Sequence, residues 1–148
     1  MKNVKITIEK TKILEDVRMQ TAYAGAKSGD DKGNFLKVAA VRSDDELLTG
    51  FWRGLCGRIT DVLKDFNLVA DISDQRMEIS LELSGSYDET LNPSVASDIE
   101  SAIASGVTAR WFSITCPERV AEYEALAEGK IRSFVGKLCH RKRPVRQG

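Results

Sequence analysis

The chain has 148 residues, of which 42% are hydrophobic and 30% are charged, and its formal net charge is zero. This size and composition are typical of one globular domain with a hydrophobic core, and no window approaches the roughly 20 apolar residues that a membrane-spanning helix requires. The three scattered cysteines are too few for a disulfide framework, so free thiols are expected.

The charges are unevenly distributed along the chain. The last twenty residues contain seven basic residues and no acidic residue, which leaves a net charge of −7 on the preceding 128 residues. An acidic body with a basic end is therefore the main electrostatic feature of the sequence. The basic residues of this end are Lys130, Arg132, Lys137, Arg141, Lys142, Arg143 and Arg146.

The first forty residues predict one strand and one helix. Residues 3–9 alternate apolar and polar side chains, which indicates a half-buried strand. Residues 11–27 are predicted to form a helix, and residues 28–34 consist of turn-forming and charged residues, which is typical of a loop. Residues 35–41 are apolar but too few for periodicity to decide between a strand and a turn of helix.

Residues 43–66 give the strongest structural signal in the sequence. Ser43 is predicted to cap a helix, with Glu46 three residues later completing a capping box. Apolar residues then recur at intervals of three and four, so one stripe of the helix must be buried. That stripe consists of Leu48, Trp52, Leu55, Ile59, Val62 and Phe66.

Three glycines interrupt this helix, at positions 50, 54 and 57. Each costs about 1 kcal/mol relative to alanine in a helix interior. Two interpretations remain open: close packing against a neighbouring helix, or a bend that is used in assembly.

The next segment predicts a β-hairpin. Residues 77–84 alternate apolar and polar side chains, and residues 68–73 are predicted to pair with them through a turn at Asp74 and Gln75. Because so few strands are not stable alone in water, they must pack on the helices or be completed by another chain.

Two further helices are predicted in the last third of the chain. The first begins near Pro93, and Gly106 is a candidate break within it. Thr115 and Glu118 form a possible second capping box around Pro117, which suits the first position of a helix. The last helix is predicted over residues 118–140.

Together these elements predict an α+β fold. It is mainly a helical bundle around the long central helix at residues 43–66, with a small inserted β-hairpin at residues 68–84. Strict alternation of strands and helices is absent, which argues against a doubly wound fold. A single domain over residues 1–140 is expected, followed by a basic C-terminal tail at residues 141–148.

No catalytic, cofactor-binding or metal-binding residue is predicted. His140 is the only histidine, and no ligand spacing typical of a metal site accompanies it. Cys139 precedes it, but neighbouring helix residues point about 100° apart and do not form a nucleophile pair. Neither a nucleophile-elbow motif nor a glycine-rich phosphate loop is present. We therefore expect a protein that is not an enzyme.

The basic end is the one candidate functional surface. Its seven cations could form a continuous positive surface that binds an acidic protein partner or a phosphate backbone. A solvated helix end, favoured by the helix dipole, is the third interpretation. The tail contains no aromatic residue that would stack on a base, which argues against recognition of single strands.

Part of the sequence resembles the small head-to-tail connector (adaptor or completion) proteins of tailed bacteriophages. The resemblance rests on the acidic start SDDELL of the helix at residues 43–66, on its apolar series, and on the late segment at residues 108–144. It implies a virion structural protein, made in the bacterial cytoplasm, that forms a ring with copies of itself and contacts portal or tail components. It supplies no functional residue that can be assigned to a position here.

Three functional hypotheses follow, and the third is an enzyme whose site would need a polar pocket that sequence patterns do not show. The first is a non-enzymatic phage assembly protein, a head-to-tail connector that oligomerises without cofactors and without a membrane. The alternative is a DNA-binding accessory protein that uses the basic C-terminal helix and tail.

Overall fold

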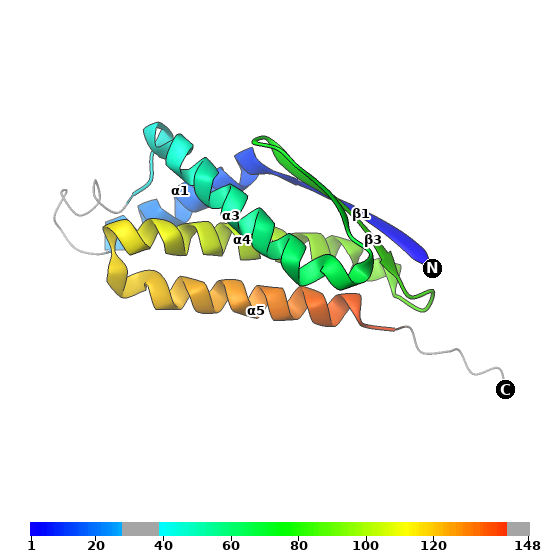
Figure 1. Ribbon diagram of the computed structural model, residues 1–148. Coiled ribbons are helices and arrows are strands. Elements are labelled where there is room, and N and C mark those ends of the chain that lie inside the picture. Colours follow the sequence, from blue (N-terminus) through cyan, green and yellow to red (C-terminus); the bar gives the residue numbers. More distant parts are fainter. Residues whose placement is uncertain (28–38, 142–148) are drawn as a thin grey trace.

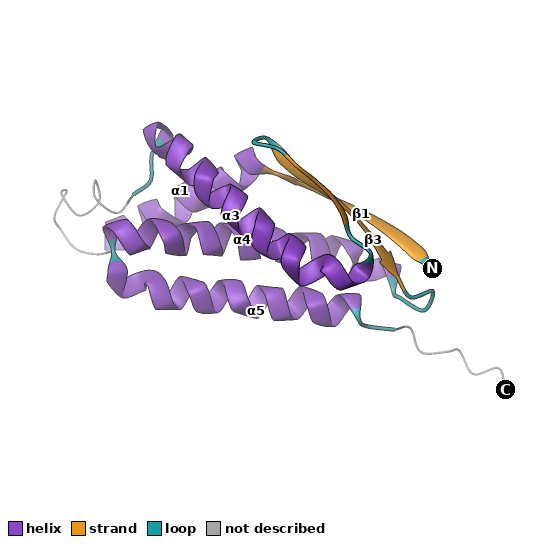
Figure 2. Ribbon diagram, in the orientation of Figure 1, coloured by secondary structure: helices purple, strands orange, loops and turns teal. Residues whose placement is uncertain are grey.

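The computed structural model describes residues 1–27 and 39–141 (Figure 1). Helices dominate the described residues, and three strands form one small sheet, which confirms the predicted α+β fold (Figure 2). The loop predicted at residues 28–34, most of the undecided segment at residues 35–41, and all but the first residue of the tail lie outside the described residues. The principal elements are β1 (Lys2–Glu9), α1 (Lys10–Lys27), α3 (Asp45–Leu63), β2 (Val69–Ile72), β3 (Arg76–Leu83), α4 (Asn92–Thr115) and α5 (Val120–Leu138).

The sheet is antiparallel and has the strand order β1-β3-β2. The predicted hairpin is confirmed: Ile72 lies opposite Met77, and the Ser73 N–H donates to the Arg76 carbonyl across the turn at 2.9 Å. β1 adds the third strand along the other side of β3, so the hairpin is completed from within the chain. The alternating apolar residues of β1 and β3 are buried, and their polar neighbours face outward.

Helix α4 is the most deeply buried helix of the fold. It contacts α1, α3, α5 and β1, and Figure 1 shows the sheet on one side of it and α5 on the other. Every residue from Ala102 to Ala109 is buried, because small side chains let neighbours approach this helix from all sides. The helix runs through Gly106 without interruption, so the break expected there is wrong.

Helix α3 confirms the long helix predicted at residues 43–66, since short 3-10 turns extend it at both ends from Arg42 to Phe66. The predicted cap is wrong in detail, because Val41 and Asp44 hold the N-cap positions and not Ser43. The Asp44 carboxylate accepts a hydrogen bond from the Val41 N–H at 2.9 Å. The tight 3-10 turn moves the N-cap of α3 from Ser43 to Asp44, so the helix itself begins at Asp45.

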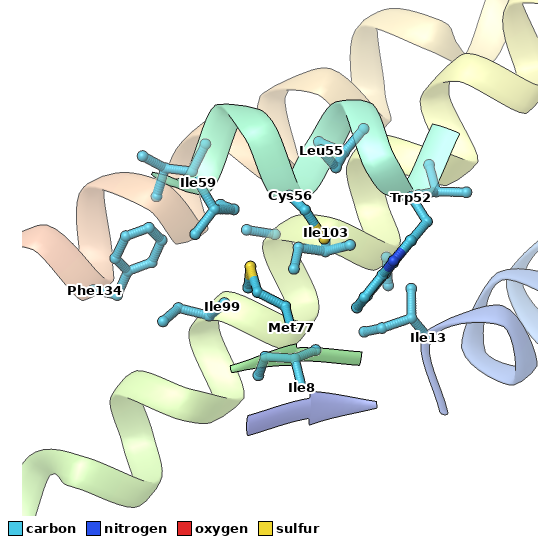
Figure 3. Packing of buried hydrophobic residues seen from close by; sticks show 14 of the residues in the cluster. Ile8, Ile13, Trp52, Leu55, Cys56, Ile59, Met77, Ile99, Ile103 and Phe134 are labelled. Atoms are coloured by element: carbon cyan, nitrogen blue, oxygen red, sulfur yellow. The ribbon is translucent and has the colours of Figure 1, made fainter. Parts of the chain in front are cut away.

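The stripe of α3 meets α4 in the centre of the core. Trp52, Cys56 and Ile59 are fully buried; Cys56 lies beside Ile103 of α4, and Trp52 lies beside Ile13 of α1 (Figure 3). The Trp52 indole N–H donates to the Ser73 carbonyl at 3.3 Å, which joins α3 to the hairpin turn. Burial of side chains of this size supplies roughly 1.5–3 kcal/mol each.

The structure supports close packing, the first of the two interpretations, for one of the three glycines of α3. A Cβ at Gly54 would lie 2.1 Å from Nη1 of Arg110 on α4, which indicates close packing there. At Gly50 and Gly57 nothing lies within 4 Å of an added Cβ, so packing in the fold does not require glycine at either position. Gly106 of α4 is in close contact as well, because its Cβ would meet the Leu55 side chain at 2.4 Å.

Helix α5 confirms the last predicted helix. Pro117 opens the short 3-10 turn Pro117–Arg119 that leads into it, as expected for a proline at the first helical position. The predicted capping box is wrong, since Thr115 is the last residue of α4 and its hydroxyl donates back to the Trp111 carbonyl at 3.2 Å. Cys116 takes the cap position, and its side chain does not cap the helix.

Candidate functional site

The structure places the described part of the basic end on the outer helix α5. Lys130, Arg132 and Lys137 belong to this helix, and Arg141 follows it. Lys142, Arg143 and Arg146 lie outside the described residues. The continuous positive surface that they were predicted to form with the others stays a prediction.

Two of these cations bind a buried carboxylate on α4. Lys137 Nζ lies 2.7 Å from Asp98 Oδ2 and 2.6 Å from the Ser94 hydroxyl, and Lys130 Nζ lies 3.8 Å from Asp98 Oδ1. The Ser133 hydroxyl donates to Asp98 Oδ2 at 2.7 Å. Since the Asp98 side chain is only 8% exposed, these contacts form a polar link within the packed α4–α5 interface.

The electrostatics of this link favour the ionised carboxylate. Burial by itself would raise the pKa of Asp98, but hydrogen bonds from Lys137 and Ser133 and the charges of both lysines outweigh it and lower the pKa. One sequence signal points to this link: Asp98 is one of only three charged residues, with Glu100 and Arg110, on a helix made mostly of small and apolar residues.

Arg132 and Arg141 differ in how they are held. Arg141 forms an isolated antiparallel bridge with Tyr87, and its Nη1 lies 3.4 Å from the Ser84 hydroxyl. Arg132 is exposed at an open depression of about 400 Å³, which His140 and Lys137 also line. The described basic end is thus partly structural, because its two lysines contact Asp98 within the fold. Arg132, in contrast, is exposed to solvent.

A second candidate surface is the sheet, whose two edge strands are unpaired on their outer sides within the described chain. All four residues of β2 are exposed, and Val69 retains 70% of its possible exposure. An edge strand of this kind presents free N–H and C=O groups that can pair with another chain. β2 carries apolar side chains and only one charged residue, Asp71, so it is a less protected edge than β1.

The hydrogen bonds at the hairpin turn determine which backbone groups of β2 face outward. Because Ser73 and Arg76 form a hydrogen-bonded pair, such pairs recur at every second residue along the antiparallel ladder. Asp71 therefore directs its N–H and C=O toward β3. Ala70 and Ile72 direct theirs toward the open edge.

The same reasoning applies to β1. The Lys10 N–H donates to the Gln75 carbonyl at 3.0 Å, in register with the β1–β3 ladder. Counting back by two from this pair, Val4, Ile6 and Ile8 direct their backbone groups at β3. Asn3, Lys5 and Thr7 direct theirs to the open edge.

A groove between α3 and α5 is the third feature. It has a volume of about 260 Å³, with Leu55, Ala127 and Ile131 among its apolar lining residues. Arg58 and Glu128 form an ion pair across it. This pair neutralises Arg58, one of the two arginines that line the groove, and joins α3 to α5.

Two of the three thiols in the described chain, Cys56 and Cys116, are buried. Burial raises the pKa of the Cys56 thiol to about 12, and burial together with Glu118 raises the pKa of Cys116, so both stay protonated at neutral pH. Among residues 1–27 and 39–141, no three His, Cys, Asp or Glu side chains gather in a way that could hold a metal ion.

Comparisons with protein-family models, with characterised proteins and with solved structures find no match. None of the helices in the described ranges combines the length and the apolar character needed to cross a membrane.

Proposed function

We propose that this chain is a non-enzymatic assembly protein that oligomerises through its sheet. The resemblance stated above suggests the setting: a head-to-tail connector of a tailed phage, made in the bacterial cytoplasm and incorporated into the virion. There it would form a ring with copies of itself and contact portal or tail components.

The exposed β2 edge is the observation that carries this proposal. Ala70 and Ile72 present unpaired backbone groups flanked by apolar side chains, on a surface separate from α5. Proteins that remain monomeric generally protect such an edge with charges, proline or a covering loop. Addition of a strand from another chain satisfies these backbone groups and buries the side chains.

The basic end supports the same proposal as a second surface. α5 packs on α4 on the side away from the sheet, so α5 offers a surface separate from the β2 edge. Surfaces of this kind suit contacts with a different partner, or head-to-tail contacts that close into rings.

Replacing Ala70 by proline tests the proposal. The Ala70 N–H points away from β3, so proline removes no hydrogen bond within the fold but removes a donor from the open edge. We expect the average mass of the wild type in sedimentation velocity to rise with protein concentration, and negative-stain images to show rings. The Ala70→Pro variant should remain monomeric.

The Ala70→Thr variant is the matched control, because threonine keeps the N–H and favours strands. It should assemble like the wild type, and both variants should keep the wild-type melting temperature to within a few degrees. A wild type that stays monomeric at every concentration would contradict the proposal, and so would a proline variant that assembles normally.

DNA binding by the basic end gives a different expected result. Each neutralised phosphate adds to the salt dependence of binding, and Lys130 and Lys137 already face Asp98. If the chain is a DNA-binding accessory protein, a salt-sensitive mobility shift of duplex DNA should be lost in the variant with Arg132→Glu, Arg143→Glu and Arg146→Glu. The absence of a shift at low salt for the wild type would exclude this alternative.

A further inference from the structure

The two edges of the sheet run in the same direction. β1 and β2 are each antiparallel to β3, so they are parallel to one another. A second copy in the same strand orientation therefore brings its β1 alongside the first copy's β2 as a parallel pair. Successive copies would then share one strand direction.

The outward backbone groups fit this parallel pairing. In a parallel ladder, a residue bonds to the two residues that flank its opposite neighbour. With Ala70 opposite Val4 of the next copy, the groups of Ala70 meet Asn3 and Lys5 of that copy. The backbone groups of Ile72 meet Lys5 and Thr7 of the same β1 strand. Asn3, Lys5 and Thr7 are the residues of β1 whose backbone groups face the open edge.

The side chains match in this register as well. Ala70 and Ile72 lie on the face of the sheet that points toward the helices, as Val4 and Ile6 do. Asp71 and Lys5 both lie on the opposite, solvent-facing side, in register with Glu78 and Ser80 of β3. Within the described chain neither Asp71 nor Lys5 has an ion-pair partner, so both charges are available to another copy.

We propose that β2 of one copy pairs in parallel with β1 of the next, with Asp71 beside Lys5. This inference rests on the proposed function and identifies the contact between copies. The sheet then continues from copy to copy in the order β1-β3-β2, with all helices on one side. Such a contact joins two different surfaces and closes into a ring when the rotation between copies allows it.

Two other pairings of the edges fit less well. A two-fold pairing of β2 with β2 that sets Ala70 opposite Ile72 also sets Asp71 opposite Asp71 of the other copy, and like charges directly opposite one another are destabilising. An antiparallel pairing of β2 with β1 sets Asp71 opposite an inward-facing residue such as Ile6. It would also turn the helices of the second copy to the other side of the sheet.

Charge reversal tests the pairing of Asp71 with Lys5. Asp71→Lys and Lys5→Asp should each weaken association by about tenfold, and the double variant should restore it, because the cross-strand pair is then rebuilt in reverse. Glu82→Lys is the control, since Glu82 lies on the same face of the central strand β3 away from Asp71. Single reversals without effect, or a double variant that is not restored, would overturn the pairing.

Disulfide trapping tests the register directly. Opposite residues of adjacent strands lie within the Cα separation that a disulfide requires. In a Cys139→Ser background, which removes the exposed thiol, an equal mixture of the Lys5→Cys and Asp71→Cys variants should form a disulfide dimer. Neither variant should form one alone.

The outcomes separate this inference from the function on which it rests. Rings in the wild type without a disulfide between positions 5 and 71 would overturn the pairing and leave the assembly function standing. A dimer formed by Asp71→Cys alone would show two-fold pairing and overturn it as well. A monomeric wild type without the disulfide would overturn both.

Discussion

Replacement of Asp98 by alanine is expected to lower the free energy of unfolding by about 3 kcal/mol, because removing one partner of a buried ion pair leaves the other uncompensated. Lys137 would lose its closest carboxylate at 2.7 Å, and Lys130 its partner at 3.8 Å. Urea denaturation followed by circular dichroism measures the change, and an unaltered midpoint would contradict the expectation.

Lysine variants show which contact matters. Lys137 is 29% exposed and lies close to the carboxylate, so Lys137→Met should cause a loss near that of Asp98→Ala. Lys130 is more exposed and more distant, and Lys130→Met should change stability by no more than about 0.5 kcal/mol. Equal effects of the two substitutions would argue against a specific link through Lys137.

The contribution of Asp98 should also depend on pH. Its pKa is lowered in the folded state, so its stabilisation is fully present above the unfolded pKa of about 3.9 and is lost as the pH falls through the lowered folded value. The difference in stability between the wild type and Asp98→Asn should therefore be constant near neutral pH and shrink below about pH 4. A difference that grows on acidification would contradict this assignment.

Gly106→Ala is expected to destabilise the fold by about 2 kcal/mol, although the same change usually favours a helix by about 1 kcal/mol. The added Cβ would lie 2.4 Å from Leu55 Cδ1 and 2.9 Å from Leu55 Cγ. Leu55 is itself buried, and its Cγ as well as its Cδ1 would have to shift to relieve the clash. Thermal and urea denaturation of the variant measure the loss.

The exposed glycines of α3 provide the control for this prediction. At Gly50 and Gly57 an added Cβ meets nothing within 4 Å, so alanine there should stabilise the fold by roughly 0.5–1 kcal/mol. In a Leu55→Ala background the clash at position 106 disappears, and Gly106→Ala should become stabilising. A destabilising effect of Gly106→Ala that persists in that background would contradict the contact with Leu55.

Local patterns predicted most elements of the fold but not the contacts between them. Alternation identified β1 and the hairpin, and the interval of three and four identified α3 and α5, because each pattern reflects one buried face. The middle of helix α4 has no such single face, since every residue from 102 to 109 is buried, and Gly106 therefore resembled a break. The reason for that glycine is its contact with Leu55, which lies 51 residues earlier in the sequence, and no local pattern reveals such a contact.

The candidate sites show the same limit. Net charge along the sequence identified the basic end, but not that Lys130 and Lys137 face Asp98, because such pairs depend on how α5 packs against α4. That β2 is an edge strand follows from the strand order, in which β1 pairs with the other side of β3. The alternation in residues 77–84 predicts a strand, but it does not say which neighbours that strand has.

The burial of the middle of α4 on all sides also determines when this chain can fold during its synthesis. β1, α1 and α3 are made first, but each packs against α4, and β1 pairs with β3 some seventy residues later. The early elements therefore have little to bury themselves against until the ribosome has released α4, and α5 completes its covering last. A fragment of residues 1–91 should accordingly lack a cooperative unfolding transition, and slow translation of the first half should prolong exposure of the Trp52 stripe to chaperones.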